Sequence, residues 1–425
     1  MKKDLISFLK NSLTTYHARE NEKEILTENG FLPLLETEDW TIEEGGKYFV
    51  ARGGALIAFT VGSLDEFSYK IAAAHNDSPA LKIKENPVVT VEKYAKLNVE
   101  KYGGGIWYSF LDRPLKIAGQ VVRKVGGALK AEAVEAPFLV TIPSVAIHQN
   151  REVNDKFAIN VQTDMQPLCS LVGEDFSSEA LLEKMVGENA VSYDLYLVNA
   201  DMPYTFGAND EFLASPRIDD LASAYALLQA LLAHGESEGI CVAAFLNREE
   251  VGSLSADGAD GDFLENTLRR IAYALRFDDN EYYKALAASF LLSSDNAHAA
   301  HPNHPEKCDP TNRARLGGGV VIKSQAGGAY ITDAMSSAVV KTLLDNANVP
   351  YQAFANRADM PGGSTLAPIS IRHVGIAGAD IGIAQLAMHS SCECIALADY
   401  EALETGVKAY YSSSIRFCED GVYVE

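Results

Sequence analysis

The stretch from Ile240 to Glu250 reads ICVAAFLNREE and joins a continuous apolar run to two adjacent carboxylates. An apolar run without alternation predicts a strand that is buried on both faces, as in the sheet of an α/β protein. Open α/β sheets bind ligands beyond the carboxyl ends of their strands. Glu249 and Glu250 repel each other and would be costly to bury without a cation. The stretch therefore predicts an α/β fold with a cation site at this edge of the sheet.

Other residues with metal-binding side chains lie near further element ends. They are His75 after Ile71–Ala74, Asp295 after Phe290–Ser294, His389 after Leu386–Met388, and Asp219 before a helical pattern over Leu221–His234. Imidazole and carboxylate are the ligands of hydrolytic zinc sites. Taken singly, each residue has an ordinary interpretation as a helix cap or a solvated loop residue. Their shared position favours a two-metal hydrolase.

Two carboxylates are candidates for supporting roles. Asp77 stands two residues after His75, so in an extended segment both side chains share a face and Asp77 can orient an imidazole. Of the Glu249-Glu250 pair, one can hold a metal while the other takes a proton from the attacking water.

The composition limits the class of protein and its partners. The 425 residues are 47% hydrophobic and 22% charged, which is typical of a globular enzyme of two or three domains. The net charge of −22 argues against nucleic acid or an anionic membrane as a partner. No apolar run approaches the roughly 20 residues of a membrane span, and charges near the N-terminus argue against a signal peptide. Six cysteines in so long a chain predict free thiols and a cytoplasmic location.

The pattern of apolar residues changes twice along the chain. Residues 1–86 and 210–425 combine helical stripes with buried runs, which predicts one discontinuous α/β domain. Residues 87–209 contain short apolar or alternating segments separated by Gly, Pro and Asn, which predicts a β-rich inserted domain.

Two further activities are excluded by the spacing of small residues. The triplets Gly103–Gly105 and Gly317–Gly319 lack the lysine and the spacing of a phosphate loop, and also the spacing of a dinucleotide fingerprint. Ser364 lacks the neighbours of a nucleophile elbow. Neither a nucleotide-binding protein nor a serine hydrolase is predicted.

The motifs as a set resemble those of the aspartyl aminopeptidase family of zinc metallo-aminopeptidases, over nearly the whole chain. They are Ala74–Pro79 (AHNDSP), Ile142–Pro143 with Ala146–His148, Asn209–Phe212 (NDEF), Arg217–Asp219 (RID), Glu249–Ser253 (EEVGS), Asp295–His298 (DNAH) with His301–Asn303 (HPN), and Met388–Ser390 (MHS). So many motifs in the order of the family make the resemblance specific.

The resemblance implies two divalent ions in each subunit, zinc first, with cobalt or manganese as alternatives. Its metal ligands would be His75 and Asp295 on one ion, Glu250 and His389 on the other, and Asp219 between them. Glu249 would be the general base and Asp77 a supporting carboxylate. The substrates would be peptides, from which N-terminal residues are removed.

The resemblance also implies a particular architecture. A zinc-peptidase catalytic domain with a central mixed sheet flanked by helices would be interrupted by an inserted dimerisation domain. Dimers would build a larger homo-oligomer, a tetrahedral dodecamer in the family. His148, in the insertion, would reach the active site of a neighbouring subunit.

Two segments depart from the family pattern. Val321–Tyr330 reads VIKSQAGGAY, where relatives often carry Asn-Gln-Arg-Tyr after the strand, and Ser391–Glu393 replaces Ile-Arg-Glu. A pocket for an acidic N-terminal residue needs a cation, because a buried unpaired carboxylate costs several kcal/mol. We therefore expect neutral N-terminal residues to be cleaved in preference to acidic ones, unless Lys323, Arg357 or Arg372 supplies the charge.

Two alternative functions remain open at the level of sequence. One is another two-metal amidohydrolase, such as a deacylase or a carboxypeptidase. The other is a catalytically silent assembly protein on the same scaffold, against which the intact Glu249-Glu250 pair argues.

Overall fold

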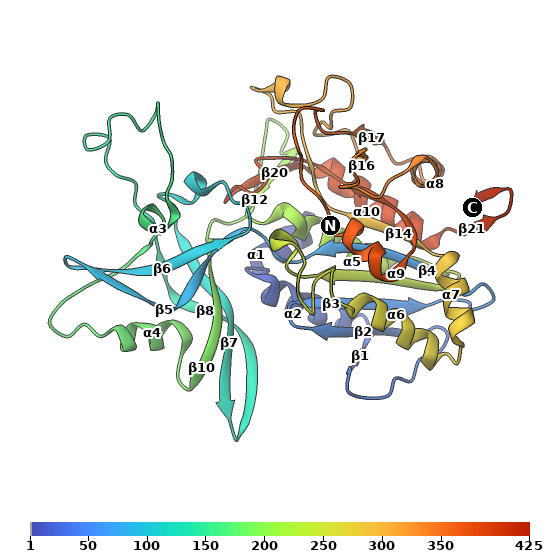
Figure 1. Ribbon diagram of the computed structural model, residues 1–425, viewed down its shortest axis with the longest axis horizontal. Coiled ribbons are helices and arrows are strands. Elements are labelled where there is room, and N and C mark those ends of the chain that lie inside the picture. The colour runs from blue at the N-terminus through green and yellow to red at the C-terminus, as the bar shows by residue number, and fades with distance from the viewer. Residues whose placement is uncertain (1) are drawn as a thin grey trace.

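A nine-stranded mixed sheet forms the centre of the protein in the computed structural model, which describes residues 2–425 (Figure 1). Strands β13, β4, β14 and β18 are neighbours and run parallel to one another. In spatial order the strands are β1 (Leu32–Leu34), β2 (Lys47–Arg52), β3 (Ala55–Val61), β13 (Ile240–Leu246), β4 (Tyr69–His75), β14 (Phe290–Ser294), β18 (Ala377–Gly382), β16 (Val320–Lys323) and β17 (Tyr351–Phe354). The expected α/β class with a central mixed sheet is confirmed.

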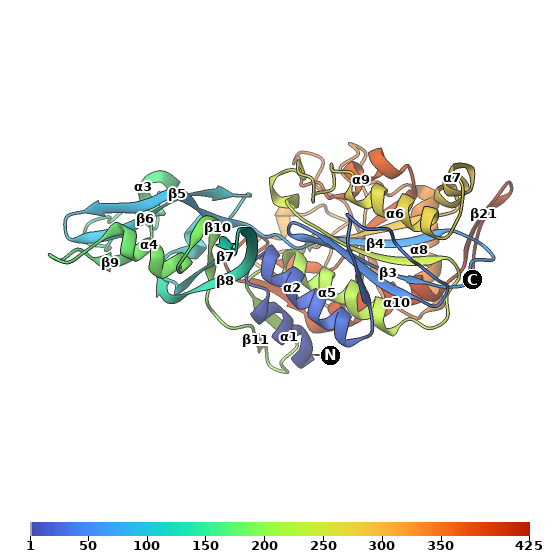
Figure 2. The same ribbon diagram turned by 90° about the horizontal axis from the view of Figure 1, so that it is seen from below.

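Helices cover both faces of this sheet (Figure 2). One face packs on α1 (Lys2–Asn11), α2 (Thr15–Glu28), α5 (Ile218–Ala233), α8 (Ala334–Asn346) and α10 (Leu397–Ser412), and the other on α6 (Phe263–Ala274), α7 (Asp279–Ala287) and α9 (Ala367–Val374). Alternate residues of β13 therefore belong to different apolar clusters, with Phe245 on one face and Leu246 on the other. Burial on both faces explains why the sequence of this strand does not alternate. No helix in the described part of the chain is long and apolar enough to cross a membrane.

The chain between β4 and β11 forms a second, β-rich body, which lies to the left in Figure 1. Its six-stranded sheet consists of β8 (Ala128–Val140), β7 (Leu115–Val125), β10 (Ala190–Asn199), β5 (Ala80–Val91), β6 (Tyr94–Tyr102) and β9 (Leu168–Leu171). Short helices, η1 (Trp107–Phe110), α3 (Val161–Asp164) and α4 (Ser178–Val186), complete it. The β-rich insert is thus present, while the expected first boundary between residues 86 and 87 falls inside β5.

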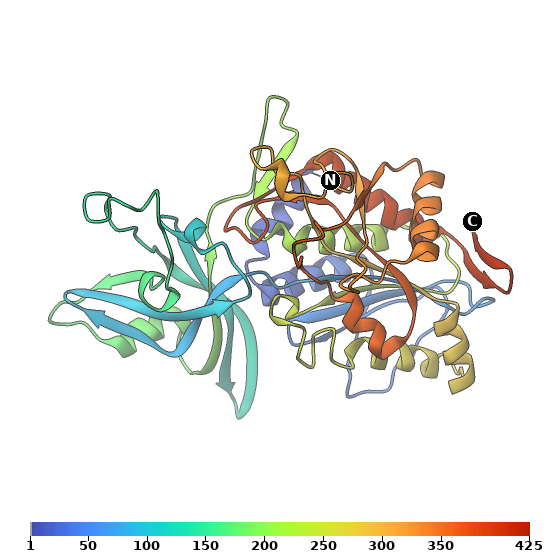
Figure 3. The same ribbon diagram turned by 45° about the horizontal axis from the view of Figure 1, so that its top comes forward.

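A five-stranded sheet stands beside the carboxyl ends of the central strands. It consists of β11 (Tyr204–Phe206), β12 (Phe212–Ser215), β20 (Glu393–Ala396), β19 (Ala384–Leu386) and β15 (Ala297–His298). Figure 3 shows its light-green β11–β12 hairpin projecting at the top of the molecule. The pairing of Ser215 with Glu393 brings the start of β20 next to the segment that leads into α5. The remaining elements are η2 (Glu249–Val251), η3 (Pro305–Lys307), β21 (Ile415–Cys418) and β22 (Gly421–Val424).

Candidate metal centre

Neighbouring parallel strands deliver polar residues to one edge of the central sheet. His75 is the last residue of β4 and pairs with Leu246, the last residue of β13. Asp295 directly follows β14, which lies on the other side of β4. Two residues separate the end of β13 from the turn η2, which contains Glu249 and Glu250. Parallel alignment alone therefore gathers residues that are far apart in the chain.

Asp219 lies between two imidazole rings. Its Oδ1 is 3.4 Å from Nε2 of His75, and its Oδ2 is 3.5 Å from Nε2 of His389. The same Nε2 of His389 is 3.4 Å from Oε1 of Glu250. Asp219 precedes the regular part of α5, and the peptide bond that joins it to Asp220 is cis. The carboxylate thus presents one oxygen to each half of the cluster.

The spacing and the unpaired oxygens of the cluster fit metal ions. Ligand atoms about 2.1 Å from a tetrahedral ion lie about 3.4 Å from each other, which matches the observed distances and is long for a hydrogen bond. Oδ1 of Asp219 and Oε1 of Glu250 are buried and accept no hydrogen bond. Possible ligand atoms lie within 4.8 Å of one another in three groups of this cluster, which are His75 with Asp220 and Asp295, His75 with Glu249 and Glu250, and Asp219 with Glu250 and His389.

Asp77 connects the two sides of the centre. Its carboxylate accepts hydrogen bonds from the backbone N–H groups of Glu249 (3.0 Å) and Glu250 (3.2 Å). Nδ1 of His75 lies 3.0 Å from the carbonyl oxygen of Asp77 and 3.5 Å from its Oδ1. Because these acceptors face Nδ1, Nε2 of His75 is left to face Asp219. Asp77 therefore orients an imidazole and the acidic turn together.

Glu249 has the acidity of a base that works at neutral pH. Burial raises its pKa to about 7, although the positive charge of His75 acts in the opposite direction. The carboxylates of Asp295 and Asp77 raise the pKa further. A general base acts best when its pKa lies near the working pH.

His389 and Glu250 hold protons when no ion is present, whereas the two histidines keep the pKa of Asp219 low despite its burial. Burial opposes a charge on His389, but the carboxylates of Asp219 and Glu250 outweigh it and raise the pKa of His389 to about 10. Burial raises the pKa of Glu250 well above its ordinary value, against the lowering effect of His389. Metal ligands must lose such protons before they bind, so an ion would displace protons from this cluster.

The structure adds two carboxylates that the sequence analysis did not assign. Glu393 is buried and accepts hydrogen bonds from the backbone N–H groups of His389 (2.7 Å) and Asp219 (2.9 Å). Asp220, also buried, accepts a 3.4 Å hydrogen bond from the backbone N–H of His75. In the sequence, Glu393 is recognisable as a charged residue beside an apolar strand segment. Asp220 is recognisable by its position next to Asp219.

His148 is not part of this cluster within its own chain. It is exposed on the loop between β8 and α3, and none of the candidate metal-binding groups of residues 2–425 includes it. In Figure 1 this loop extends from the inserted domain.

A mixed sheet with a buried imidazole and buried carboxylates at the ends of its parallel strands is typical of a metal-dependent hydrolase. The sequence model of the aminopeptidase I zinc metalloproteases, peptidase family M18, matches residues 8–411. The chain belongs to this family.

Curated relatives and solved structures agree with this assignment. The "probable M18 family aminopeptidase 2" of Clostridium acetobutylicum is 41% identical, over 96% of this chain and 98% of the relative, and that of Pseudomonas aeruginosa is 36% identical, over 96% and 97%. The cryo-EM structure of the Ape4 and Nbr1 complex matches with a TM-score of 0.92 at 32% identity, over 96% of this chain and 84% of that one. The M18 aminopeptidase of Thermotoga maritima matches with a TM-score of 0.86 at 25% identity, over 97% and 95%.

The protein is therefore a metallo-aminopeptidase, which removes N-terminal residues from peptides with the help of divalent metal. This decides between the functions that the sequence left open, because the family is one of aminopeptidases rather than deacylases or carboxypeptidases.

Proposed function

We propose that each subunit binds two divalent ions, with zinc as the native metal and cobalt or manganese as substitutes. One ion would be held by His75 and Asp295 and the other by Glu250 and His389, with Asp219 between them. The observation that carries this proposal is the position of Asp219, whose two oxygens each face the Nε2 atom of a different histidine. A single ion would leave one of these buried pairs without a cation.

The residues of the chain supply proton transfer and positioning. When bound, the ions supply Lewis acidity at the peptide carbonyl and lower the pKa of water in the site. Glu249 takes a proton at its carboxylate from the attacking water and delivers it to the amine that leaves. Asp77 holds the backbone of Glu249 and so fixes where that carboxylate stands.

Reconstitution of the metal-free enzyme tests the number and the identity of the ions. We expect activity to rise until about two equivalents of zinc per subunit are bound, with cobalt and manganese also restoring turnover. Saturation of both binding and activity at one equivalent would contradict the two-ion proposal.

We propose that neutral N-terminal residues are preferred over acidic ones, so that this member departs from the aspartyl specificity its motifs resemble. Ala326–Tyr330 carries no cation. Lys323 is buried, donates a hydrogen bond to the carbonyl oxygen of Asn296 and lies 3.7 Å from Oδ2 of Asp295. Arg357 and Arg372 each pair with an aspartate. All three cations are thus already engaged.

Matched substrates test this specificity. We expect a higher kcat/KM for a Leu substrate than for an Asp substrate at saturating metal. A clear preference for Asp would contradict the proposal, and loss of that preference in Lys323→Met would then identify Lys323 as its source.

We propose that the chain forms dimers through the inserted domain and that dimers assemble into a tetrahedral dodecamer. A structural relative with a TM-score of 0.82 and 26% identity is described as the S. cerevesiae mApe1 dodecamer. The inserted sheet exposes large apolar side chains that a partner could cover, among them Leu129, Leu139, Leu171 and Val191. Light scattering at several protein concentrations tests the assembly, and a monomer at all of them would contradict it.

We further propose residues 1–86 and 210–425 as the catalytic domain, residues 87–209 as the dimerisation domain, and the cytoplasm as the working compartment. The cysteines of the described chain are all free thiols, which suits a reducing environment. Cell fractionation with thiol labelling tests the location, and oxidised cysteines in the native protein would contradict it.

A further inference from the structure

The end of strand β6 passes directly over the metal centre, although β6 belongs to the inserted domain. We call residues Tyr102–Ile106 the overpass segment. Its three contacts with the centre involve Asp77, Glu250 and His389, which come from separate parts of the catalytic domain. We propose that the overpass segment positions the metal centre and the acidic turn, so that the inserted domain sets catalytic geometry in its own subunit. This inference rests on the metal ligands proposed above.

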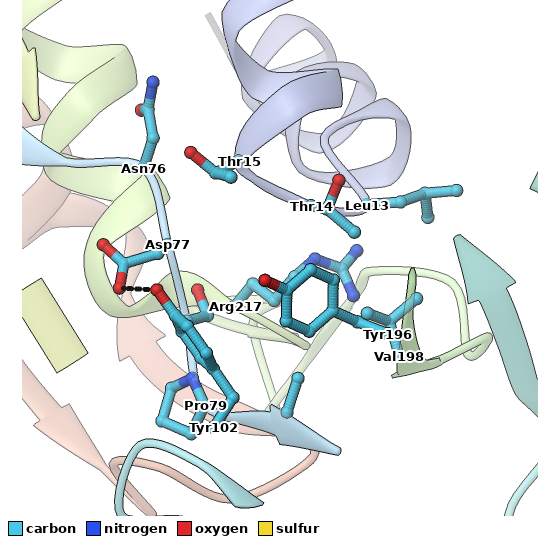
Figure 4. Close-up of a pocket in the computed structure, with 12 residues that line it drawn as sticks. Leu13, Thr14, Thr15, Asn76, Asp77, Pro79, Tyr102, Tyr196, Val198 and Arg217 are labelled. Atoms are coloured by element: carbon cyan, nitrogen blue, oxygen red, sulfur yellow. Dashed lines mark hydrogen bonds between the residues drawn. The ribbon is translucent and has the colours of Figure 1, made fainter. Parts of the chain in front are cut away.

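The first contact is a hydrogen bond from Tyr102 to Asp77. The hydroxyl of Tyr102 donates to Oδ2 of Asp77 at 2.8 Å, as Figure 4 shows. Both side chains are buried. The same carboxylate holds the N–H groups of the turn that contains Glu249. A buried carboxylate keeps its orientation only while its hydrogen bonds are made, so Tyr102 acts on Glu249 through Asp77.

The second contact fixes an imidazole. The carbonyl oxygen of Gly104 lies 3.0 Å from Nδ1 of His389, and the N–H of Ile106 donates to the carbonyl oxygen of His389 at 2.8 Å. A carbonyl can only accept, so Nδ1 carries a proton and Nε2 is left to face Asp219. Metal-binding histidines are commonly oriented by such an acceptor on the second ring nitrogen.

The third contact requires a glycine. Gly103 has φ +73°, and a Cβ atom placed on it would lie 3.1 Å from Cβ of Glu250 and 3.3 Å from its carbonyl oxygen. A side chain at this position would displace Glu250 or lift the segment from the centre. Gly103–Gly105 do not have the spacing of a nucleotide-binding loop. Gly103 instead allows the backbone to approach a metal ligand closely.

The joint, by which we mean the contact between the two domains next to the overpass segment, is tightly packed. A shift of the overpass segment would therefore move the residues that it contacts. Tyr102 and Tyr196 meet edge to face with ring centroids 5.3 Å apart. The crevice that these rings line with Leu13 and Arg217 measures about 30 Å³, which holds water but no peptide side chain (Figure 4). The crevice is thus a domain joint rather than a substrate pocket, and the Tyr102 ring stays anchored if its hydroxyl is removed.

The test compares Tyr102→Phe and Gly103→Ala with matched controls. Tyr196→Phe removes a hydroxyl from the same joint, which donates to Asp194 instead of Asp77. Gly126→Ala changes another glycine of positive φ, which has open space around it. Zinc affinity is measured by competition with a chromophoric chelator, together with kcat, KM and the melting temperature.

We expect Tyr102→Phe to lose about 10–100-fold in zinc affinity or in kcat, with KM changed less than about twofold. We expect at least as large a loss for Gly103→Ala, and neither effect in the two controls. A Tyr102→Phe variant with zinc affinity and kcat equal to those of the parent would overturn the inference. An equal loss in Tyr196→Phe would also overturn it, because general damage to the joint would then explain both.

Variants of the proposed ligands separate this inference from the function on which it rests. If Glu250→Gln and His389→Ala keep both metal and activity, the ligand set fails and the inference fails with it. If they lose metal while Tyr102→Phe does not change, only the role of the overpass segment is refuted.

Discussion

Two groups of histidine and carboxylate side chains in this chain have similar chemistry and very different surroundings. One is the metal centre around Asp219. The other consists of Asp262, Glu265 and His373, at the start of α6 and in the last turn of α9, and its ligand atoms also lie within 4.8 Å of one another. Residue types and spacing alone therefore do not distinguish them.

Burial and neighbouring charge separate the two groups. The side chain of Asp262 is 66% exposed, whereas that of Asp219 is 3% exposed. His373 also lies 3.4 Å from Asp260, which pairs with Arg372 at 2.7 Å, so the surface group already has cations and water around it. An exposed carboxylate such as Asp262 and a partly exposed one such as Glu265, which pairs with Arg269, need no ion, while buried ones with unpaired oxygens do. The comparison shows that the carboxylates around Asp219 need a cation because they are removed from water.

The largest expected effect concerns proton transfer at the buried group. Glu249→Gln keeps the shape of the side chain but removes the base, so kcat should fall by about 10²–10⁴-fold while both ions stay bound. The matched control at the surface is Glu265→Gln, which should leave kcat unchanged. Steady-state kinetics with metal analysis checks both, and near-normal turnover in Glu249→Gln would refute its role as base.

Substitutions in the two groups should also differ strongly in their effect on the affinity for zinc. Loss of an outer partner of a metal ligand typically weakens binding by about 10–100-fold, so removal of a direct ligand in His389→Ala should exceed about 100-fold. His373→Ala should bind zinc as the parent does. Equilibrium dialysis measures both variants. Equal weakening in the two would mean that the surface group also holds an ion.

The inserted domain offers a test of sharing between subunits. Mixtures of the inactive variants Glu249→Gln and His148→Ala should recover about a quarter of the parental activity, because half of randomly formed dimers are mixed and one of their two sites is intact. Refolding the two variants together and measuring turnover checks this. No recovery in oligomers shown to be mixed would mean that His148 does not act across the interface.

The smallest expected effect is a pH trend. Burial raises the pKa of Glu249 to about 7 in the folded metal-free protein, above the value of about 4.3 in an unfolded chain. Between these values the folded state binds more protons, so the free energy of unfolding of the metal-free protein falls as pH rises. Metal binding needs deprotonated ligands, so the affinity for metal increases as pH rises.

The melting temperature should therefore respond to metal more strongly at higher pH. Calorimetry should show that the difference in melting temperature between the zinc-loaded and the metal-free protein increases from about pH 5 to about pH 8. The His373→Ala variant should show the same widening. A gap that stays constant or narrows would contradict the protonation scheme of the buried group.

The central sheet could be predicted because burial on both faces leaves a local signal. Runs such as Ile240–Leu246 are apolar without interruption, and the first polar residues after them mark the carboxyl edge of the sheet. The same signal located His75 and Asp295. The structure brings them together because β4 lies between β13 and β14.

The supporting contacts could not be predicted, because they join distant residues through the backbone. Glu393 accepts from the N–H of Asp219 across 174 positions in the chain, and Tyr102 reaches Asp77 from a different domain. The first boundary of the inserted domain could not be predicted either. Strand β5 runs through Asn86 and Pro87 without ending, so the polar break in the sequence marks a register shift against β6 and not the end of a domain.

Anomalous diffraction from crystals of the zinc-loaded protein tests the central claim most directly. That claim is that desolvation, and not residue type, decides which group binds metal. We expect two anomalous peaks in each subunit, one on either side of Asp219, and none beside His373. A single peak at Asp219, or a peak at the surface group of equal height, would contradict it.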